Sequence, residues 1–249
     1  MPVKSKFTRI LVGSNGAGGA WDFSGVSNSL SVELASERLE DTTFQASGRT
    51  FLAGDTDGTI SQEGYYDNSG ANTFEQEIAE SVANSELLYV AALFGTDTAA
   101  CAAYVAPQTS TDNMAIAAPV SELITVSGSW GSGTGIRRGL RLATATISAT
   151  GAQTHIDLGV AGSTGGAAWL FVTAVTGTAT SATATVQSSS TVGFGSPATE
   201  GTFTFSGKGT YAIALSGAID RYVRLNVTSM GGATNFTVTA IIAVNGVTQ

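Results

Sequence analysis

Apolar and polar residues alternate along most of the chain, the pattern of strands that bury one face. In residues 28–34, Leu30, Val32 and Leu34 fall on one side, and serines and a glutamate on the other. The sequence predicts further short strands at 7–12, 59–66, 87–94, 100–106, 114–117, 124–130 and 138–147.

One segment departs from this alternation. From Phe74 to Val82, large apolar residues recur every four positions, which is the spacing of a helix face. Thr73, with Gln76 three positions later, forms a capping box. The sequence predicts one helix at about residues 73–84.

The last hundred residues have almost only strand patterns separated by glycine-rich turns. About seven strands are expected, at 155–159, 167–175, 181–188, 201–205, 210–215, 221–228 and 235–244. Their near-regular spacing predicts a β-sandwich of immunoglobulin-like or jelly-roll type. Small and polar residues at 148–153 suggest a boundary, so we expect domains at 1–150 and 151–249.

A polar, glycine-containing stretch interrupts the first domain at residues 37–57. The sequence predicts a long loop there, and loops of this length in compact domains are usually functional. Within it, Asp55-Thr56-Asp57-Gly58 resembles the start of a calcium loop, but the following residues do not keep the spacing. A turn is the favoured interpretation of these four residues.

The net charge of −8 is unevenly spread along the chain. Residues 1–150 hold 16 Asp and Glu against 8 Lys and Arg, and residues 151–249 hold three of each. An acidic surface argues against binding nucleic-acid phosphates, which requires clustered Lys and Arg. Arg137, Arg138 and Arg141 are the densest basic cluster, and they could pair with a neighbouring copy or form an ordinary solvated strand end.

The sequence gives no support for catalysis, a metal or a cofactor. The single histidine, His155, precedes Asp157 by two positions, but no glycine-framed serine accompanies them. With one histidine and one cysteine, Cys101, a zinc site or an internal disulfide is not expected. No signal-peptide core or membrane span is apparent, so we expect synthesis in the cytoplasm.

Several segments of the first domain, in order, resemble the major tail tube proteins of long-tailed bacteriophages (siphophages). They are Ser27-Asn28-Ser29-Leu30-Ser31-Val32-Glu33, Leu39-Glu40-Asp41-Thr42-Thr43-Phe44, Gly48-Arg49-Thr50-Phe51-Leu52-Ala53-Gly54 and Gly58-Thr59-Ile60-Ser61-Gln62-Glu63-Gly64-Tyr65-Tyr66-Asp67. The resemblance is firmest over residues 25–70 and looser through residue 147.

The resemblance implies a small β-barrel or sandwich flanked by one helix, closing into six-fold rings that stack into a hollow tube for DNA ejection. It implies a virion protein, assembled in the host cytoplasm, whose partners are itself and the tape measure, tail tip and tail terminator proteins. Double-stranded DNA would pass without specific binding. A loop at about residues 39–58 would contact the adjacent ring, through Thr42, Thr43, Phe44, Arg49 and Phe51.

The second domain departs from the shortest members of that family, and we expect it on the tube exterior. It resembles β-sandwich modules of phage tails, some of which are similar to carbohydrate-binding folds. The alternative function is therefore a carbohydrate-binding adhesin or receptor-binding tail protein. Trp169, Phe171 and Tyr222 could be sugar platforms, although strand positions of this kind more often belong to a core. A virion depolymerase would need paired carboxylates in a cleft, and the sequence does not favour it.

Overall fold

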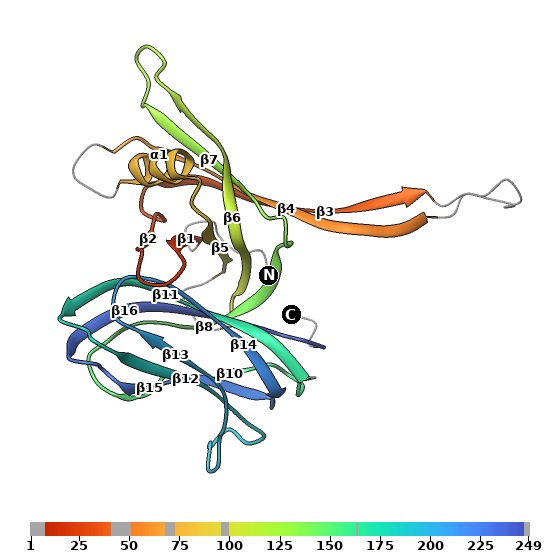
Figure 1. Cartoon of the computed structure of the whole chain (residues 1–249), viewed down its shortest axis with the longest axis vertical. Helices are drawn as coiled ribbons and strands as arrows, with labels where there is room; N and C mark the ends of the chain where they lie inside the picture. Colours follow the sequence, from red (N-terminus) through yellow and green to blue (C-terminus); the bar gives the residue numbers. More distant parts are fainter. Residues whose placement is uncertain (1–7, 41–50, 68–72, 96–99, 163, 247–249) are drawn as a thin grey trace, which may run out of the picture. The chain divides into compact units, whose positions relative to one another are not determined.

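The computed structural model describes residues 8–40, 51–67, 73–95, 100–162 and 164–246. Within these residues the chain forms sixteen β-strands and one α-helix (Figure 1). The strands belong to two antiparallel sheets. The predicted mainly β fold with a single helix is confirmed.

The chain divides into two compact units that interleave along the sequence. Unit 1 comprises residues 1–25, 88–105 and 137–249, and unit 2 comprises residues 26–87 and 106–136. The domain boundary predicted at residue 150 falls inside unit 1, so the compact units do not coincide with the predicted division of the sequence.

The larger sheet of unit 1 contains β1 (Arg9–Ser14), β2 (Ala20–Asp22), β5 (Leu88–Phe94), the start of β6 (Ala102–Ala117), β8 (Arg137–Ile147), β11 (Thr164–Gly177), β14 (Gly209–Ala218) and β16 (Ala233–Val244). Its order is β14-β11-β16-β8-β6-β5-β1-β2. The Gly16 amide, just after β1, donates a hydrogen bond to the Thr210 carbonyl of β14 at 2.8 Å, so this sheet curls towards closure. One of its faces carries an apolar cluster that includes Leu11, Phe171 and Ile241.

The smaller sheet of unit 1 contains β9 (Gly151–Ala152), β10 (Ile156–Asp157), β12 (Ala182–Ser189), β13 (Ala198–Phe205) and β15 (Tyr222–Ser229). Its order is β10-β15-β12-β13, and β9 also pairs with β15. Alternate residues of β12 and β15 are buried, as expected for strands with one face on a core.

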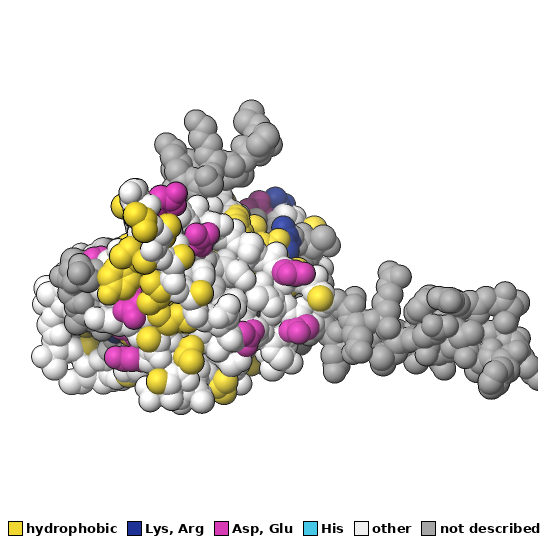
Figure 2. Space-filling model, turned by 90° about the horizontal axis from the view of Figure 1, so that it is seen from above, with side chains coloured by type: hydrophobic (Ala, Val, Ile, Leu, Met, Phe, Trp, Pro, Cys, Tyr) yellow, Lys and Arg dark blue, Asp and Glu magenta, His cyan; other side chains and the backbone are white. Residues whose placement is uncertain are grey.

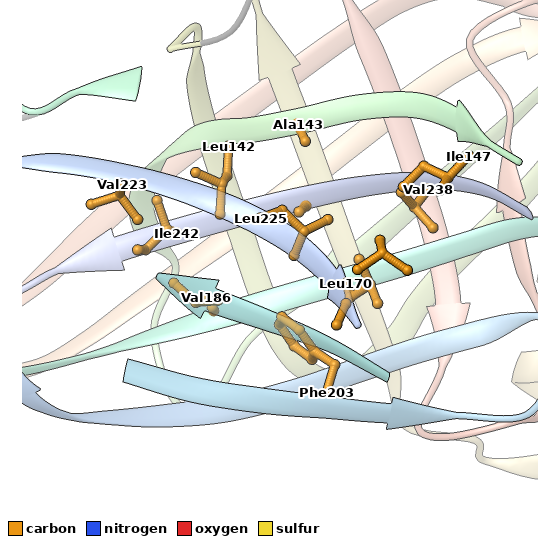
Figure 3. Close-up of a cluster of buried hydrophobic side chains, with 14 of the residues drawn as sticks. Leu142, Ala143, Ile147, Leu170, Val186, Phe203, Val223, Leu225, Val238 and Ile242 are labelled. Carbon is orange, nitrogen blue, oxygen red and sulfur yellow. The ribbon is translucent and has the colours of Figure 1, made fainter. Parts of the chain in front are cut away.

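The two sheets of unit 1 stack through an apolar core (Figure 3). Side chains of β8, β11 and β16 meet those of β12, β13 and β15. Phe205 and Phe236 join the layers edge to face, with ring centroids 5.1 Å apart. The expected β-sandwich is present, and it includes β8, which the sequence assigns to the first domain.

Unit 2 is built on β3 (Ser27–Glu40), β4 (Phe51–Tyr65), the second part of β6 and β7 (Thr125–Gly131), in the order β3-β4-β7-β6. Helix α1 (Phe74–Asn84) packs against this sheet. The Thr73 hydroxyl accepts a hydrogen bond from the Gln76 amide, and the side chains of Phe74 and Ile78 are buried. The predicted helix and its N-cap are confirmed.

Some local interpretations of the sequence were wrong. The sequence predicts a loop over residues 37–57, but β3 continues to Glu40, β4 begins at Phe51, and these two residues pair. The turn predicted at Asp55–Gly58 lies within β4, and the strands predicted at 100–106 and 114–117 are the single strand β6. Cross-strand hydrogen bonds hold these polar segments extended, although their own pattern does not favour strands.

Candidate functional surface

One face of the sheet of unit 2 is lined by small polar side chains. On β4, Ile60 and Gln62 are buried, while Ser61 and Glu63 alternate with them and reach the opposite face. The same alternation on the neighbouring strands assembles a surface that we call the serine face. Its residues are Ser29, Ser31, Ser61, Glu63, Asn113, Ser127 and Ser129, and they line a shallow open depression of about 370 Å³.

Strand register aligns these side chains in rows. Asn113 of β6 pairs with Ser129 of β7, Ser129 pairs with Ser61 of β4, and Ser61 pairs with Ser31 of β3. One polar row therefore crosses all four strands. A continuous hydroxyl surface of this kind hydrogen-bonds to water and offers few apolar anchors to a macromolecule.

The opposite face of this sheet is covered by α1. Ile78 lies over Gly128, where an added Cβ would approach the Ile78 Cδ1 to 2.7 Å. The Phe74 and Trp130 rings pack with centroids 6.5 Å apart. The absence of a side chain at Gly128 lets Ile78 pack closely on this side of the sheet, and the serine face is left on the other side.

Unit 2 also has two open sheet edges and an arm. Among the described residues β3 pairs with β4 alone, and β6 pairs with β7 over residues 110–117. β4 pairs with β7 only over Thr59–Tyr65, so residues 51–57 pair with β3 alone and extend beyond β7 as a two-stranded arm (Figure 1). An isolated two-stranded ribbon is marginally stable in water, which favours a role in contacting another chain.

The difference in net charge between the two units is larger than that between residues 1–150 and 151–249. Unit 2 holds 14 Asp and Glu against 2 Arg, a net charge of −12, whereas unit 1 holds 5 against 9 Lys and Arg, a net charge of +4. In the view of Figure 2, acidic side chains are spread over the surface and basic ones occupy a small area. Unit 2 is therefore the part of the chain that repels polyanions.

The predicted inter-ring residues are mostly not placed by the structure. Thr42, Thr43, Phe44 and Arg49 lie outside the described residues. Phe51 begins β4 at the end of the arm. These contacts remain a prediction.

The three arginines of the predicted cluster differ in exposure. Arg137 and Arg138 are exposed, whereas Arg141 is only 2% exposed. The role of the three residues in a subunit interface remains a prediction, and in the single chain only Arg137 and Arg138 present side chains at the surface.

The three aromatic residues considered as sugar platforms differ in exposure. Trp169 and Phe171 are buried in the core of unit 1, while Tyr222 is partly exposed.

Arg221 donates two hydrogen bonds of 2.7 Å to the two carboxylate oxygens of Asp157. These bonds, with one from the Gly159 amide, lower the pKa of Asp157 to about 2. Asp157 is thus engaged by Arg221, and the His155 ring packs against Phe194 and Tyr222.

Within the part of the chain that the structure describes, no group of three His, Cys, Asp or Glu side chains could hold a metal ion. The same part contains no helix long and apolar enough to span a membrane.

The serine face was not identified from the sequence. The signal was present, because Ser29 and Ser31 alternate with Leu30 and Val32, and Ser127 and Ser129 flank Gly128. What the sequence lacks is the pairing of β3, β4, β7 and β6, which brings these serines from distant positions into one surface.

Comparison with known proteins gives partial similarity to tail components. No family model matches the chain, and no curated protein matches its sequence. The tail of an empty gene transfer agent particle with C6 symmetry aligns with 45% of this chain and 80% of its own, at 11% identity and a TM-score of 0.37. The SPP1 tail tube aligns with 55% of this chain and 78% of its own, at 13% identity and a TM-score of 0.45.

A third similar structure is the SPP1 Dit protein, described as a hub of the adsorption apparatus in phages that infect Gram-positive bacteria. It aligns with 94% of this chain and 98% of its own, at 10% identity and a TM-score of 0.34.

Proposed function

We propose that this chain is a structural, non-catalytic bacteriophage tail protein that polymerises as stacked six-fold rings into the hollow tube through which DNA is ejected. The observation that supports this most directly is the four-stranded sheet of unit 2, which has a hydrated serine face and two open edges. The ordered segments that resemble siphophage tail tube proteins fall mainly on β3 and β4 of this sheet.

The open edges provide a means of ring closure. Among the described residues, β3 pairs in a ladder only with β4, and residues 110–117 of β6 pair only with β7, so the opposite edge of each strand is available to a strand of another copy. If β3 of one copy pairs with β6 of the next, the contact is heterologous and closes into a ring when the rotation fits. Closure also removes the exposed edges that would otherwise promote aggregation.

The serine face would then form the inner wall of the ring. Ser31, Ser61 and Ser129 carry no charge, and the exposed carboxylates of Glu33 and Glu63 lie on β3 and β4. Repetition of these carboxylates around a ring gives a negative potential that repels DNA phosphates. DNA could pass such a wall without adhering to it.

The proposed partners follow the same model. The chain binds itself within and between rings, and the tape measure, tail tip and tail terminator proteins would contact the finished tube. Its location would be the virion, after assembly in the host cytoplasm. This part rests on the sequence resemblance.

Negative-stain electron microscopy of the purified full chain at high concentration tests polymerisation. Hollow tubes of uniform width with a regular axial repeat are expected. Discrete monomers or dimers under conditions where a preformed tail tip is supplied as a seed would contradict the proposal.

Charge reversal tests which surface faces the channel. The double variant Glu33→Lys, Glu63→Lys should convert the wall to one that retains double-stranded DNA, seen as salt-sensitive co-sedimentation of DNA with tubes. The matched control, Glu75→Lys with Glu80→Lys, makes the same charge change on α1. Equal DNA retention by both double variants would contradict the assignment of the serine face to the channel.

A further inference from the structure

The outer face of the small sheet in unit 1 carries an arginine held in a fixed orientation. Arg224 alternates on β15 with the buried residues Val223 and Leu225, so its side chain lies on the face away from the core. The Arg224 Nε donates a hydrogen bond of 2.9 Å to the Gln187 Oε1 of neighbouring β12. The guanidinium carbon lies 4.1 Å from the centroid of the Phe194 ring.

Phe194 reaches this position through an unfavourable backbone conformation. It lies between β12 and β13 with a φ of 49°, in the left-handed region that bulky residues rarely occupy. Phe194 is nevertheless only 7% exposed, and its ring packs against Arg224 and His155. Strain of this kind persists only where the surroundings enforce it, and it often accompanies ligand-binding sites.

Arg224 also differs from its neighbour Arg221 in charge compensation. Arg221 is paired with both oxygens of Asp157. Among the described residues Arg224 has no carboxylate within ion-pair distance, and its terminal nitrogens have no hydrogen-bond partner. A planar guanidinium that is fixed at its Nε and its ring face, with two nitrogens free, is suited to bind a carboxylate in bidentate geometry.

Aromatic and hydrogen-bonding side chains share the outer face with Arg224. The Tyr222 and His155 rings lie edge to face with centroids 5.7 Å apart, and Tyr222 is partly exposed. Asn226 and Thr185, paired across β15 and β12, continue the same face with polar side chains. Aromatic rings stack on the apolar faces of sugars, and amide and hydroxyl groups bond to sugar hydroxyls.

We propose that this outer face binds an acidic saccharide, with Arg224 holding the sugar carboxylate and Tyr222 and His155 contacting the sugar ring. The site lies wholly within unit 1 and does not depend on polymerisation. It would give the assembled particle a weak affinity, multiplied by the number of copies, for acidic polysaccharide on a cell surface.

Saturation-transfer difference NMR of the full chain provides the test, with oligogalacturonate and sialyllactose as acidic probes. Their matched neutral probes are methyl-esterified oligogalacturonate and lactose. At least one acidic probe should bind, and its neutral counterpart should bind about ten-fold or more weakly. Failure of both acidic probes to bind, or equal binding of the neutral ones, would overturn the proposal.

Three variants locate the contact. Arg224→Gln should lower affinity about ten-fold or more, whereas Lys208→Gln removes the same charge next to Trp21 and should leave it unchanged. Gln187→Ala keeps the charge of Arg224 but removes the hydrogen bond that orients its Nε. A smaller loss of affinity is expected. This variant gives a result even if Arg224→Gln folds poorly. Unchanged binding in both Arg224→Gln and Gln187→Ala would overturn the assignment of the site.

Discussion

The two compact units differ in the size of their apolar cores and in their net charge. Unit 1 has an apolar core between two sheets and a second apolar cluster on the curled sheet. In unit 2, fewer large apolar side chains are buried among the described residues, and they include Ile60, Ile78 and Trp130. Unit 2 also carries a net charge of −12, against +4 for unit 1.

This difference indicates which surfaces are complete in the single chain. A small core and strong like-charge repulsion both weaken a compact state. Unit 2 nevertheless keeps open edges, a hydrated face and a two-stranded arm, features that cost stability in isolation. We infer that unit 1 supplies most of the stability of the chain, and that unit 2 is specialised for contacts with other copies.

The largest expected effect concerns residues 41–50, the segment that joins the two strands of the arm in the sequence. Replacing residues 41–50 by Asn-Gly would close β3 and β4 with a two-residue turn directly beyond the Glu40–Phe51 pair. The chain should remain folded by circular dichroism but lose tube formation completely in electron microscopy. Tubes of normal width and repeat from this variant would show that residues 41–50 are not required for assembly.

A pair of core substitutions tests whether the units differ in stability. Ile78→Ala should destabilise unit 2 by about 2–5 kcal/mol, and Phe236→Ala should destabilise unit 1 by about 3–5 kcal/mol. Ile78 and Phe236 are 1% and 0% exposed. In Ile78→Ala, hydrogen exchange by mass spectrometry should accelerate in α1 and β7 while β11 and β16 stay protected. Equal acceleration throughout the chain would mean that the units unfold together.

The helix cap offers a smaller perturbation confined to unit 2. Thr73→Ala removes the hydroxyl that accepts the Gln76 amide hydrogen bond and should cost about 1 kcal/mol. Thr73→Ser retains an acceptor and serves as the control. Urea denaturation monitored by Trp130 fluorescence, with Trp21 and Trp169 replaced by Phe, should rank the variants in this order. An equal loss in both would show that the cap is not the cause.

The smallest effect is expected at the exposed pair of Asp157 and Arg221 in unit 1. The folded pKa of Asp157, about 2, lies below its ordinary value of 3.8, so the pair stabilises the folded state above about pH 4. This contribution is lost as the pH falls from 3.8 through 2. Asp157→Asn should lower the melting temperature slightly at pH 6, and the difference should shrink below about pH 4 and vanish below about pH 2. A difference that stays constant with pH would exclude this ionisation as its source.

The sequence predicted best where local chemistry determines structure. The helix was predicted at 73–84 and is observed at Phe74–Asn84, because its cap and apolar period are local signals. The alternating strands of the second half were predicted for the same reason. The arm and the serine face were missed, because polar residues become strands there only through pairing with distant partners.

The surroundings of Arg224 could not be predicted from the local sequence either. Arg224, Gln187 and Phe194 come from β15, β12 and the loop after β12, and neither their approach nor the φ of Phe194 is encoded by spacing. The sequence places Arg221 and Arg224 three positions apart, and nothing in this spacing separates the arginine paired with a carboxylate from the one that is not.

The interleaved order of the units has a consequence for synthesis on the ribosome. All strands of unit 2 have been translated once residue 136 is made, so that unit can form while the rest of the chain is still emerging. Unit 1 cannot, because β8 pairs with β16, which is translated about ninety residues later. Each nascent chain thus exposes the open sheet edges of unit 2 before unit 1 can fold. On a polysome, neighbouring chains would be at high local concentration during that interval, and premature pairing between them is a hazard that a chaperone could relieve.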